Sequence, residues 1–308
     1  MARGRLPDFL IVGAQKCGTT SLYYWLREHP SCFLPKIKEP HYFSRFEPWE
    51  KLVVSGSIIR DEIAYKKLFA EANEGQICGE ASPSYLYETG VATRIAEAQP
   101  GCRCIIIVRD PVERAYSQYR MNVVGGTETR SFLEAIESSV GKKPTSWSEQ
   151  NDIYIELSRY GTQLQRYFDA FPRDQILVVT AHTLAADPLE VMKQVSDLLQ
   201  IEAAWWDSFD FKRHHEGRIP RNPLVKKLLT STTARAMGRA LIPKGARPFV
   251  AERVLSKKPP RAEFDLQARE IIWSEIESEI RELERLLGRR LPELWGSHPD
   301  NIGKSTSL

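Results

Sequence analysis

The sequence predicts an α/β protein whose core is a doubly wound parallel β-sheet flanked by helices. Three short apolar runs, at 9–12, 104–108 and 175–179, are typical of buried parallel strands. Each run is followed by a turn and then by residues with helical spacing, and strands that alternate with helices favour this fold. Ligands bind such sheets at the carboxyl ends of the strands, so the loops after these runs are the first candidates for a site.

Helices are predicted from the spacing of apolar side chains and from their end signals. The first, Thr19–Glu28, has one apolar stripe and ends before Pro30. Further helices are predicted from Pro111 to about Met121, over about 188–199 and over Leu266–Leu287. Gly288 and Pro292 close the last one, whose apolar stripe is typical of a packing element.

Charge is distributed unevenly along the 308 residues, which carry 43 Lys and Arg against 40 Asp and Glu. Residues 218–261, called the basic segment below, have a net charge of +11 and leave −8 on the rest of the chain. Their Pro, Arg and Lys content predicts loops and a lid, with short helical pieces such as 222–230. We expect a single domain over 1–308, with the basic segment and a C-terminal helix region at 262–295 as its last parts.

The basic segment indicates an anionic ligand, substrate or surface. One interpretation of Lys226, Lys227, Arg235 and Arg239 is contact with an anionic acceptor or peripheral association with an anionic membrane. The other is a solvated basic face. No nucleic acid partner is expected, and the sequence leaves the oligomeric state open.

Cysteine and histidine usage favours a protein with free thiols and no metal site. The five cysteines are Cys17, Cys32, Cys78, Cys102 and Cys104. Their odd number and their spacing favour free, mostly buried thiols in a reducing compartment. The six histidines lack zinc-binding spacing. No apolar run has the length of a signal peptide core or of a membrane span, so we expect a cytoplasmic protein.

The loop Gly13–Gly18 joins the first predicted strand to the first helix. Its glycines and the helix start behind it present backbone N–H groups and a positive dipole end, an arrangement suited to phosphate. It differs from a nucleotide P-loop because Thr19, not lysine, follows the second glycine, and the lysine stands inside the loop as Lys16. There it can neutralise charge on a departing oxygen. The alternative is a surface turn with an incidental lysine.

A second motif, Arg109–Ser117, follows the second predicted strand. Arg109 stands at the carboxyl end of that strand and Ser117 lies on the helix after it, so a guanidinium and a hydroxyl can converge on a monoester phosphate. The alternative treats Asp110-Pro111 as an ordinary helix start and Arg109 as a surface charge.

Together these motifs make the chain resemble the PAPS-dependent sulfotransferase superfamily, whose fold is P-loop-like. Among its branches the chain is most similar to the heparan sulfate and bacterial carbohydrate-type enzymes. The resemblance runs from about Pro7 to Trp295 and rests on four blocks of sequence. They are Gln15–Ser21, Lys38–Phe43, Arg109–Ser117 and the Leu-Leu-Gly-Arg-Arg-Leu run at 286–291.

The resemblance implies a donor, 3′-phosphoadenosine-5′-phosphosulfate (PAPS), with PAP as its product, and no metal. Lys16 would stabilise the leaving phosphate. The 5′-phosphosulfate would be held by Gln15, Lys16, Cys17, Gly18, Thr19, Thr20 and Ser21. The 3′-phosphate would be held by Arg109 and Ser117, and the nucleotide would be covered by Arg218, Arg221 and Asn222.

The resemblance also implies that Glu39 is the general base that takes the proton from an acceptor hydroxyl. The alternative for Glu39 is an ion pair with Lys36 or Lys38. His41 is either a second candidate base or a residue that orients the first, and we favour the orienting role.

The implied acceptor is a glycan or small-molecule hydroxyl, with a carbohydrate as first choice and a lipid or secondary-metabolite hydroxyl second. An amine acceptor is less favoured. The chain departs from the heparan sulfate branch at Ala81, where a lysine commonly follows the glutamate corresponding to Glu80. Glu80 itself either faces the cleft or closes a loop. Tyr42 and Tyr85 either stack on an acceptor or pack in the core.

The rival enzyme prediction is a P-loop small-molecule kinase. Such a kinase would need the Walker lysine, which this sequence lacks, and Asp110 as a magnesium ligand. A non-enzymatic nucleotide sensor is a further rival.

Overall fold

The computed structural model describes residues 4–46, 58–144, 146, 149–211, 219–220, 256–257 and 265–301. Five parallel strands form one sheet in the order β2-β3-β1-β4-β5. They are β1 (Phe9–Gly13), β2 (Cys32–Phe33), β3 (Ile77–Ala81), β4 (Arg103–Val108) and β5 (Ile176–Thr180). The doubly wound parallel sheet predicted from the sequence is therefore confirmed.

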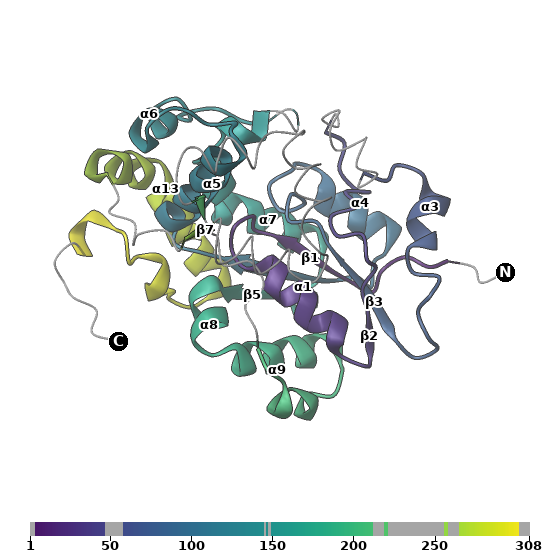
Figure 1. Cartoon of the computed structure of the whole chain (residues 1–308). Coiled ribbons are helices and arrows are strands. Elements are labelled where there is room, and N and C mark those ends of the chain that lie inside the picture. The colour runs from purple at the N-terminus through teal and green to yellow at the C-terminus, as the bar shows by residue number, and fades with distance from the viewer. Residues whose placement is uncertain are drawn as a thin grey trace.

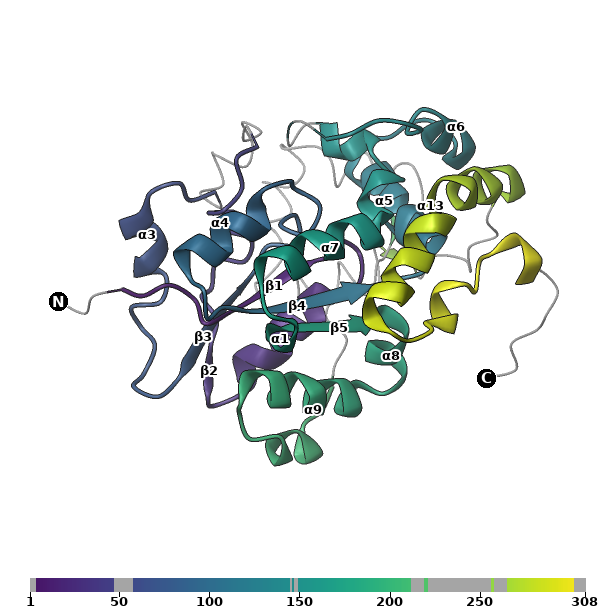
Figure 2. The same ribbon diagram turned by 180° about the vertical axis from the view of Figure 1, so that it is seen from behind.

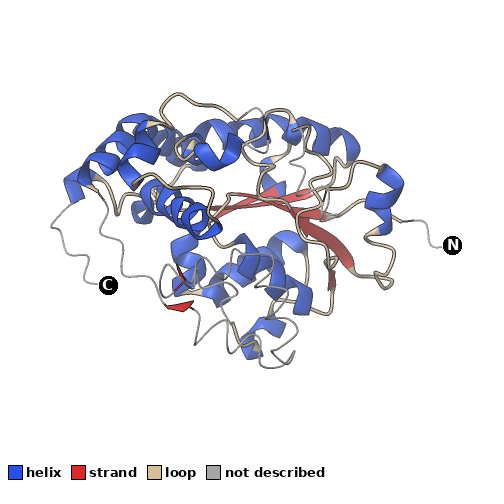
Figure 3. Ribbon diagram, turned by 45° about the horizontal axis from the view of Figure 1, so that its top comes forward, coloured by secondary structure: helices blue, strands red, loops and turns tan. Residues whose placement is uncertain are grey.

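Helices cover both faces of the sheet, as Figures 1 and 2 show from opposite sides and Figure 3 from a tilted view. One face carries α1 (Thr19–Glu28), α8 (Ala181–Ala186) and α9 (Pro188–Leu199). The other carries α4 (Val91–Ala98), α5 (Pro111–Gly125), α7 (Tyr160–Ala170) and α13 (Leu266–Leu287). Two shorter helices, α3 (Glu62–Lys67) and α6 (Phe132–Glu137), lie near the ends of the molecule.

The strands are short, apolar runs because both of their faces are covered. All five residues of β1 are buried, and so are the last five of β4. Buried parallel strands need this continuous apolar pattern, whereas a half-exposed strand would alternate. The five cysteines belong to this interior, since all of them are buried and free, as predicted.

End signals place the helix boundaries. The Asp110 carboxylate accepts from Val112 N and Glu113 N, each at 3.0 Å, and so caps α5, with Pro111 at its first position. The helix runs four residues beyond the predicted end near Met121, to Gly125, and stops where Gly126 takes a φ of 78°. The predicted bounds of the final helix, 266–287, are those of α13.

Only four residues of the basic segment belong to the described structure. Ile219–Pro220 (β6) pairs antiparallel with Ser256–Lys257 (β7). The predicted helical piece at 222–230 and the cations Lys226, Lys227, Arg235 and Arg239 lie outside the described residues. Within the described ranges, no helix combines the length and apolar character required to cross a bilayer.

Candidate functional site: a loop, an arginine and a carboxylate at one sheet edge

The loop Gly13–Gly18 leaves the carboxyl end of β1 and enters α1. Ala14 N donates to Ile107 O of β4 at 2.8 Å, which fixes the start of the loop against the neighbouring strand. A Cβ at Gly13 would lie 2.4 Å from Leu86 Cβ, so only glycine fits there. Gly18 caps α1 with a φ of 104° and without a side chain, and the first turn has no acidic residue. The positive end of α1 is thus left open to an anion.

Lys16 lies inside this loop, and its side chain is partly buried. Its Nζ donates to Met121 Sδ of α5 at 3.4 Å, and thioether sulfur is a weak acceptor. Burial lowers the pKa of Lys16, the Arg109 charge lowers it further, and the Glu39 charge opposes both. A partly desolvated ammonium whose described acceptor is weak interacts favourably with an incoming anion.

Arg109, at the carboxyl end of β4, joins the second predicted motif to the first. Its Nη1 donates to Lys16 O at 3.3 Å, and its Nε pairs with Glu113 Oε2 at 2.9 Å. Ser117 lies half-buried two turns into α5, and its hydroxyl bonds to none of the described residues. Two motifs about ninety residues apart in sequence therefore meet at one edge of the sheet.

The other loop residues differ in how far they face solvent. Gln15, Thr20 and Ser21 are partly buried, Gly18 is exposed, and Thr19 is buried. Cys17 is buried, and burial raises the pKa of its thiol to about 11. A buried thiol with a raised pKa is unreactive, and Cys17 Sγ packs against Tyr160 OH at 3.9 Å.

Glu39 and His41 lie on a loop that rests on the carboxyl end of β3. Glu39 N donates to Ala81 O at 3.0 Å, and His41 N donates to Ser82 Oγ at 3.2 Å. The Glu39 carboxylate pairs with the ammonium of Lys38 and remains 40% exposed. The ion pair considered from the sequence is therefore present.

His41 is buried beside Glu39, with its Nε2 at 3.8 Å from Glu39 Oε2 and its Nδ1 at 3.0 Å from Ser84 Oγ. Burial lowers the pKa of His41 to about 4, so the ring is neutral at pH 7. A neutral, buried ring fixed by a hydroxyl is suited to orienting Glu39.

Glu80 closes the loop beneath these residues and does not face the cleft. It is completely buried, and its carboxyl accepts from Tyr65 OH at 3.2 Å and from Ser82 Oγ at 2.8 Å. Burial raises the pKa of Glu80 to about 7. Tyr85 is also buried and Tyr42 stacks on Tyr65 at 4.1 Å, so both of these tyrosines pack in the protein.

Backbone conformation marks the same residues independently. Lys16, Glu39 and His41 have φ values of 69°, 63° and 52°. In the described part of the chain the one other non-glycine residue with positive φ is Gln200, which ends α9. Such conformations cost about 1–3 kcal/mol each and gather at functional sites.

Three predicted donor-site residues lie outside the described structure, and three residues at the site were not predicted from the sequence. Arg218, Arg221 and Asn222 lie outside the described residues. The sequence did not predict Met121, Ser82 or Ser84 as site residues. A single polar or thioether side chain outside a motif gives no signal in one sequence. Within the described ranges, no three His, Cys, Asp or Glu side chains gather as metal ligands.

The contacts of Asp110 favour a structural role over the magnesium ligand that the kinase alternative requires. Both oxygens of this carboxylate are occupied, because Oδ1 accepts from Ser297 Oγ at 2.6 Å and Oδ2 from Ser297 N at 2.8 Å, besides capping α5. Asp110 joins the C-terminal segment to α5 and is not available as a magnesium ligand.

Comparison with known proteins gives a consistent result. The mouse (Mus musculus) heparan sulfate glucosamine 3-O-sulfotransferase 3A1 is 30% identical over 254 residues, which are 82% of this chain and 58% of that protein. The human (Homo sapiens) bifunctional heparan sulfate N-deacetylase/N-sulfotransferase 3 is 29% identical over 202 residues, 64% of this chain and 22% of that protein. The chain thus spans less than two thirds of these relatives.

A solved structure covers more of the chain. The sulfotransferase from Alicyclobacillus acidocaldarius is similar with a TM-score of 0.69 and 27% identity, over 94% of this chain and 98% of that one. The family model described as sulfotransferase domain matches residues 6–215. That match contains the loop with Lys16, the Glu39 loop and the Arg109 motif, and on this ground the chain belongs to the sulfotransferase family.

Proposed function

We propose that this protein transfers a sulfuryl group from PAPS to a hydroxyl of a carbohydrate acceptor. The observation that carries the proposal is the hydrogen bond of Arg109 Nη1 to Lys16 O, at 3.3 Å. It joins a loop suited to the 5′-phosphosulfate to an arginine suited to the 3′-phosphate. PAPS has these two anionic groups on one nucleoside, so it needs two anion sites side by side.

The reaction in this geometry is an in-line displacement at sulfur. Glu39 takes the proton from the acceptor hydroxyl as the new oxygen–sulfur bond forms. The bond between sulfur and the 5′-phosphate oxygen breaks, and the electron pair stays on PAP. Lys16 neutralises the charge that develops on that oxygen. His41 packs beside Glu39, and the open N-terminus of α1 binds the 5′-phosphate throughout.

A carbohydrate acceptor is supported by the relatives, whose names specify heparan sulfate. Ala81 is fully buried and supplies only its carbonyl to Glu39 N, so this chain has no cation at that position. We therefore propose a sugar hydroxyl as the acceptor without assigning it to heparan sulfate.

The experiment that tests the donor site is calorimetric titration with PAP in the absence of magnesium. Arg109→Ala is expected to weaken binding at least tenfold, since it removes a charge-assisted contact. The matched control is Arg103→Ala, at the opposite end of the same strand, whose guanidinium bonds to Gln200 at 3.1 Å. Equal affinities for both variants, or no binding of PAP to the wild type, would overturn the donor assignment.

The acceptor is tested with ³⁵S-labelled PAPS and a panel of oligosaccharides, phenols and hydroxylated lipids. Labelled sugar products that survive mild acid indicate O-sulfation, because N-sulfates are acid-labile. Label that enters only phenols or lipids would refute the carbohydrate proposal. Glu39→Gln should abolish transfer while PAP binding changes less than threefold.

A further inference from the structure

Arg114 is a completely buried guanidinium on α5, with no exposed surface. Its Nη1 donates to Gln118 Oε1 at 2.9 Å, its Nε donates to Ser158 Oγ, and its Nη2 donates to Tyr154 O. All three acceptors are neutral oxygens. Buried cations are usually paired with carboxylates, because taking a charge out of water is costly. Among the described residues, therefore, no group that hydrogen-bonds to Arg114 compensates its charge.

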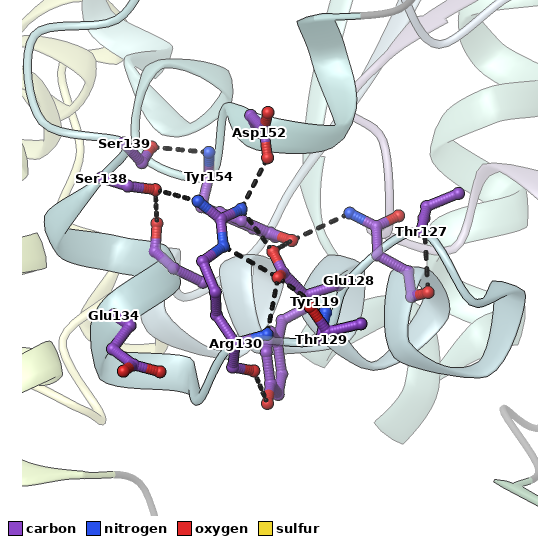
Figure 4. Close-up of polar contacts among 12 residues, drawn as sticks. Tyr119, Thr127, Glu128, Thr129, Arg130, Glu134, Ser138, Ser139, Asp152 and Tyr154 are labelled. Atoms are coloured by element: carbon purple, nitrogen blue, oxygen red, sulfur yellow. Dashed lines mark hydrogen bonds and ion pairs between the residues drawn. The ribbon is translucent and has the colours of Figure 1, made fainter.

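Glu128, the carboxylate bonded to the Tyr154 side chain, is paired with another arginine, Arg130, as Figure 4 shows. Glu128 receives Arg130 Nε at 2.9 Å and Nη2 at 2.7 Å, and Arg130 also pairs with Asp152 at 2.6 Å. Tyr154 OH donates to Glu128 Oε2 at 2.9 Å, and Tyr154 N donates to Ser139 Oγ at 2.8 Å. These residues hold the segment that supplies two of the acceptors of Arg114, so its guanidinium is fixed in place.

Arg114 lies on the helix that flanks the loop Gly13–Gly18, because Arg109 before it and Met121 after it both contact Lys16. Its acceptor Ser158 stands two residues from Tyr160, whose hydroxyl faces Cys17 Sγ of the loop at 3.9 Å. In sequence Arg114 stands between Arg109 and Ser117 on α5. Burial lowers the pKa of Lys16 most, and the charges of Arg109 and Arg114 lower it further. Burial likewise lowers the pKa of Arg114, against the opposing influence of Tyr160 and Cys17, the latter a residue of the loop. Two cations, Lys16 and Arg109, therefore lie at the loop, and a third, Arg114, lies in the interior beside it.

We propose that Arg114 is a buried electrostatic residue of the donor site, which attracts the phosphates of PAPS and PAP without touching them. This inference rests on the proposed function, because it assumes an anionic nucleotide at the loop. Electrostatic interactions persist over several ångströms in the poorly hydrated interior and are weakly screened by salt there. The contribution of Arg114 to affinity must then increase with the charge of the ligand, and it must vanish for a neutral one.

The experiment compares three ligands of decreasing charge, namely PAP, adenosine 5′-monophosphate and adenosine, by calorimetry at constant ionic strength. Arg114→Gln is expected to weaken PAP about tenfold and the monophosphate less, and to leave adenosine within twofold. The matched control, Ser158→Ala, removes one neutral acceptor but keeps the charge, and it should bind PAP within threefold of the wild type. Equal weakening of all three ligands by Arg114→Gln, or unchanged PAP affinity, would overturn the proposal.

Arg114→Lys gives a second test that does not require the Gln variant to fold. A lysine at this buried position loses its proton at lower pH than an exposed one, whereas arginine stays charged. PAP affinity of Arg114→Lys should match the wild type near pH 6 and fall at least fivefold relative to it by pH 9. Parallel affinities of the two proteins across this range would refute the electrostatic role. Absence of PAP binding by the wild type would instead refute the proposed function itself.

Discussion

Replacing Glu128 by Gln tests the cluster in Figure 4 and removes one charge with little change of shape. The side-chain hydrogen bonds from Arg130 lower the pKa of Glu128 from its ordinary 4.5 to about 2. At about 1.4 kcal/mol per pKa unit, this lowering corresponds to about 3 kcal/mol of folding free energy. Arg130 is 32% exposed, so water screens part of the interaction, and we expect Glu128→Gln to lose about 2 kcal/mol at pH 7.

The pH dependence distinguishes this charge effect from simple loss of packing. Folded Glu128 binds a proton less tightly than unfolded Glu128, so its contribution is complete above about pH 4.5 and is lost as the pH falls towards 2. Urea denaturation of the wild type and Glu128→Gln at pH 7, 5 and 3.5 measures it. The stability difference should shrink at pH 3.5, and Glu137→Gln, an exposed control, should cost less than about 0.5 kcal/mol. A difference that stays constant with pH, or one below about 0.5 kcal/mol at pH 7, would refute the reasoning.

Further predictions concern the loop and the groups beneath Glu39. Gly13→Ala places a methyl 2.4 Å from Leu86 Cβ and should cost about 1–3 kcal/mol by denaturation; a variant as stable as the wild type would contradict the packing. Because burial raises the pKa of Glu80 to about 7, the folded state holds this proton more tightly than the unfolded state. The stability of Glu80→Gln relative to the wild type should therefore improve by about 3 kcal/mol from pH 4.5 to above pH 7 in urea denaturation, and a flat difference would exclude that shift. Burial lowers the pKa of His41 to about 4, so its ring NMR signals should remain those of neutral imidazole down to about pH 5; a midpoint near 6.5 would show an exposed ring.

The parts of the fold that follow local rules could be predicted from the sequence. The first helix starts at Thr19 and the last ends at Leu287, because glycines mark both positions. The two-residue strand β2 could not be predicted, since Cys32–Phe33 is too short to have a pattern. Helix α5 ends at Gly125, four residues after the predicted end, because the spacing of apolar residues marks a helix end less sharply than the glycine Gly126 does.

The site was predictable where a motif fixes both residue type and backbone. The structure places Lys16 and Arg109 in contact, as motifs at the ends of adjacent parallel strands require. Glu80 could not be placed, because the sequence does not show which face of β3 meets Tyr65. Arg114 was missed for a similar reason. From the sequence alone, an arginine on a helix is expected at the surface, and its burial is evident only when the packing of the neighbouring segment is known.

The positive φ values of Lys16, Glu39 and His41 also bear on how this protein can be engineered or can evolve. Glycine or asparagine would relax each of these positions, since both residues tolerate left-handed backbone. A library selected for heat resistance alone should accumulate such replacements and lose turnover with each of them. Selection for turnover should restore the original side chains at a lower melting temperature. If these residues have the roles proposed above, the most stable and the most active sequences of this chain should differ at these three positions.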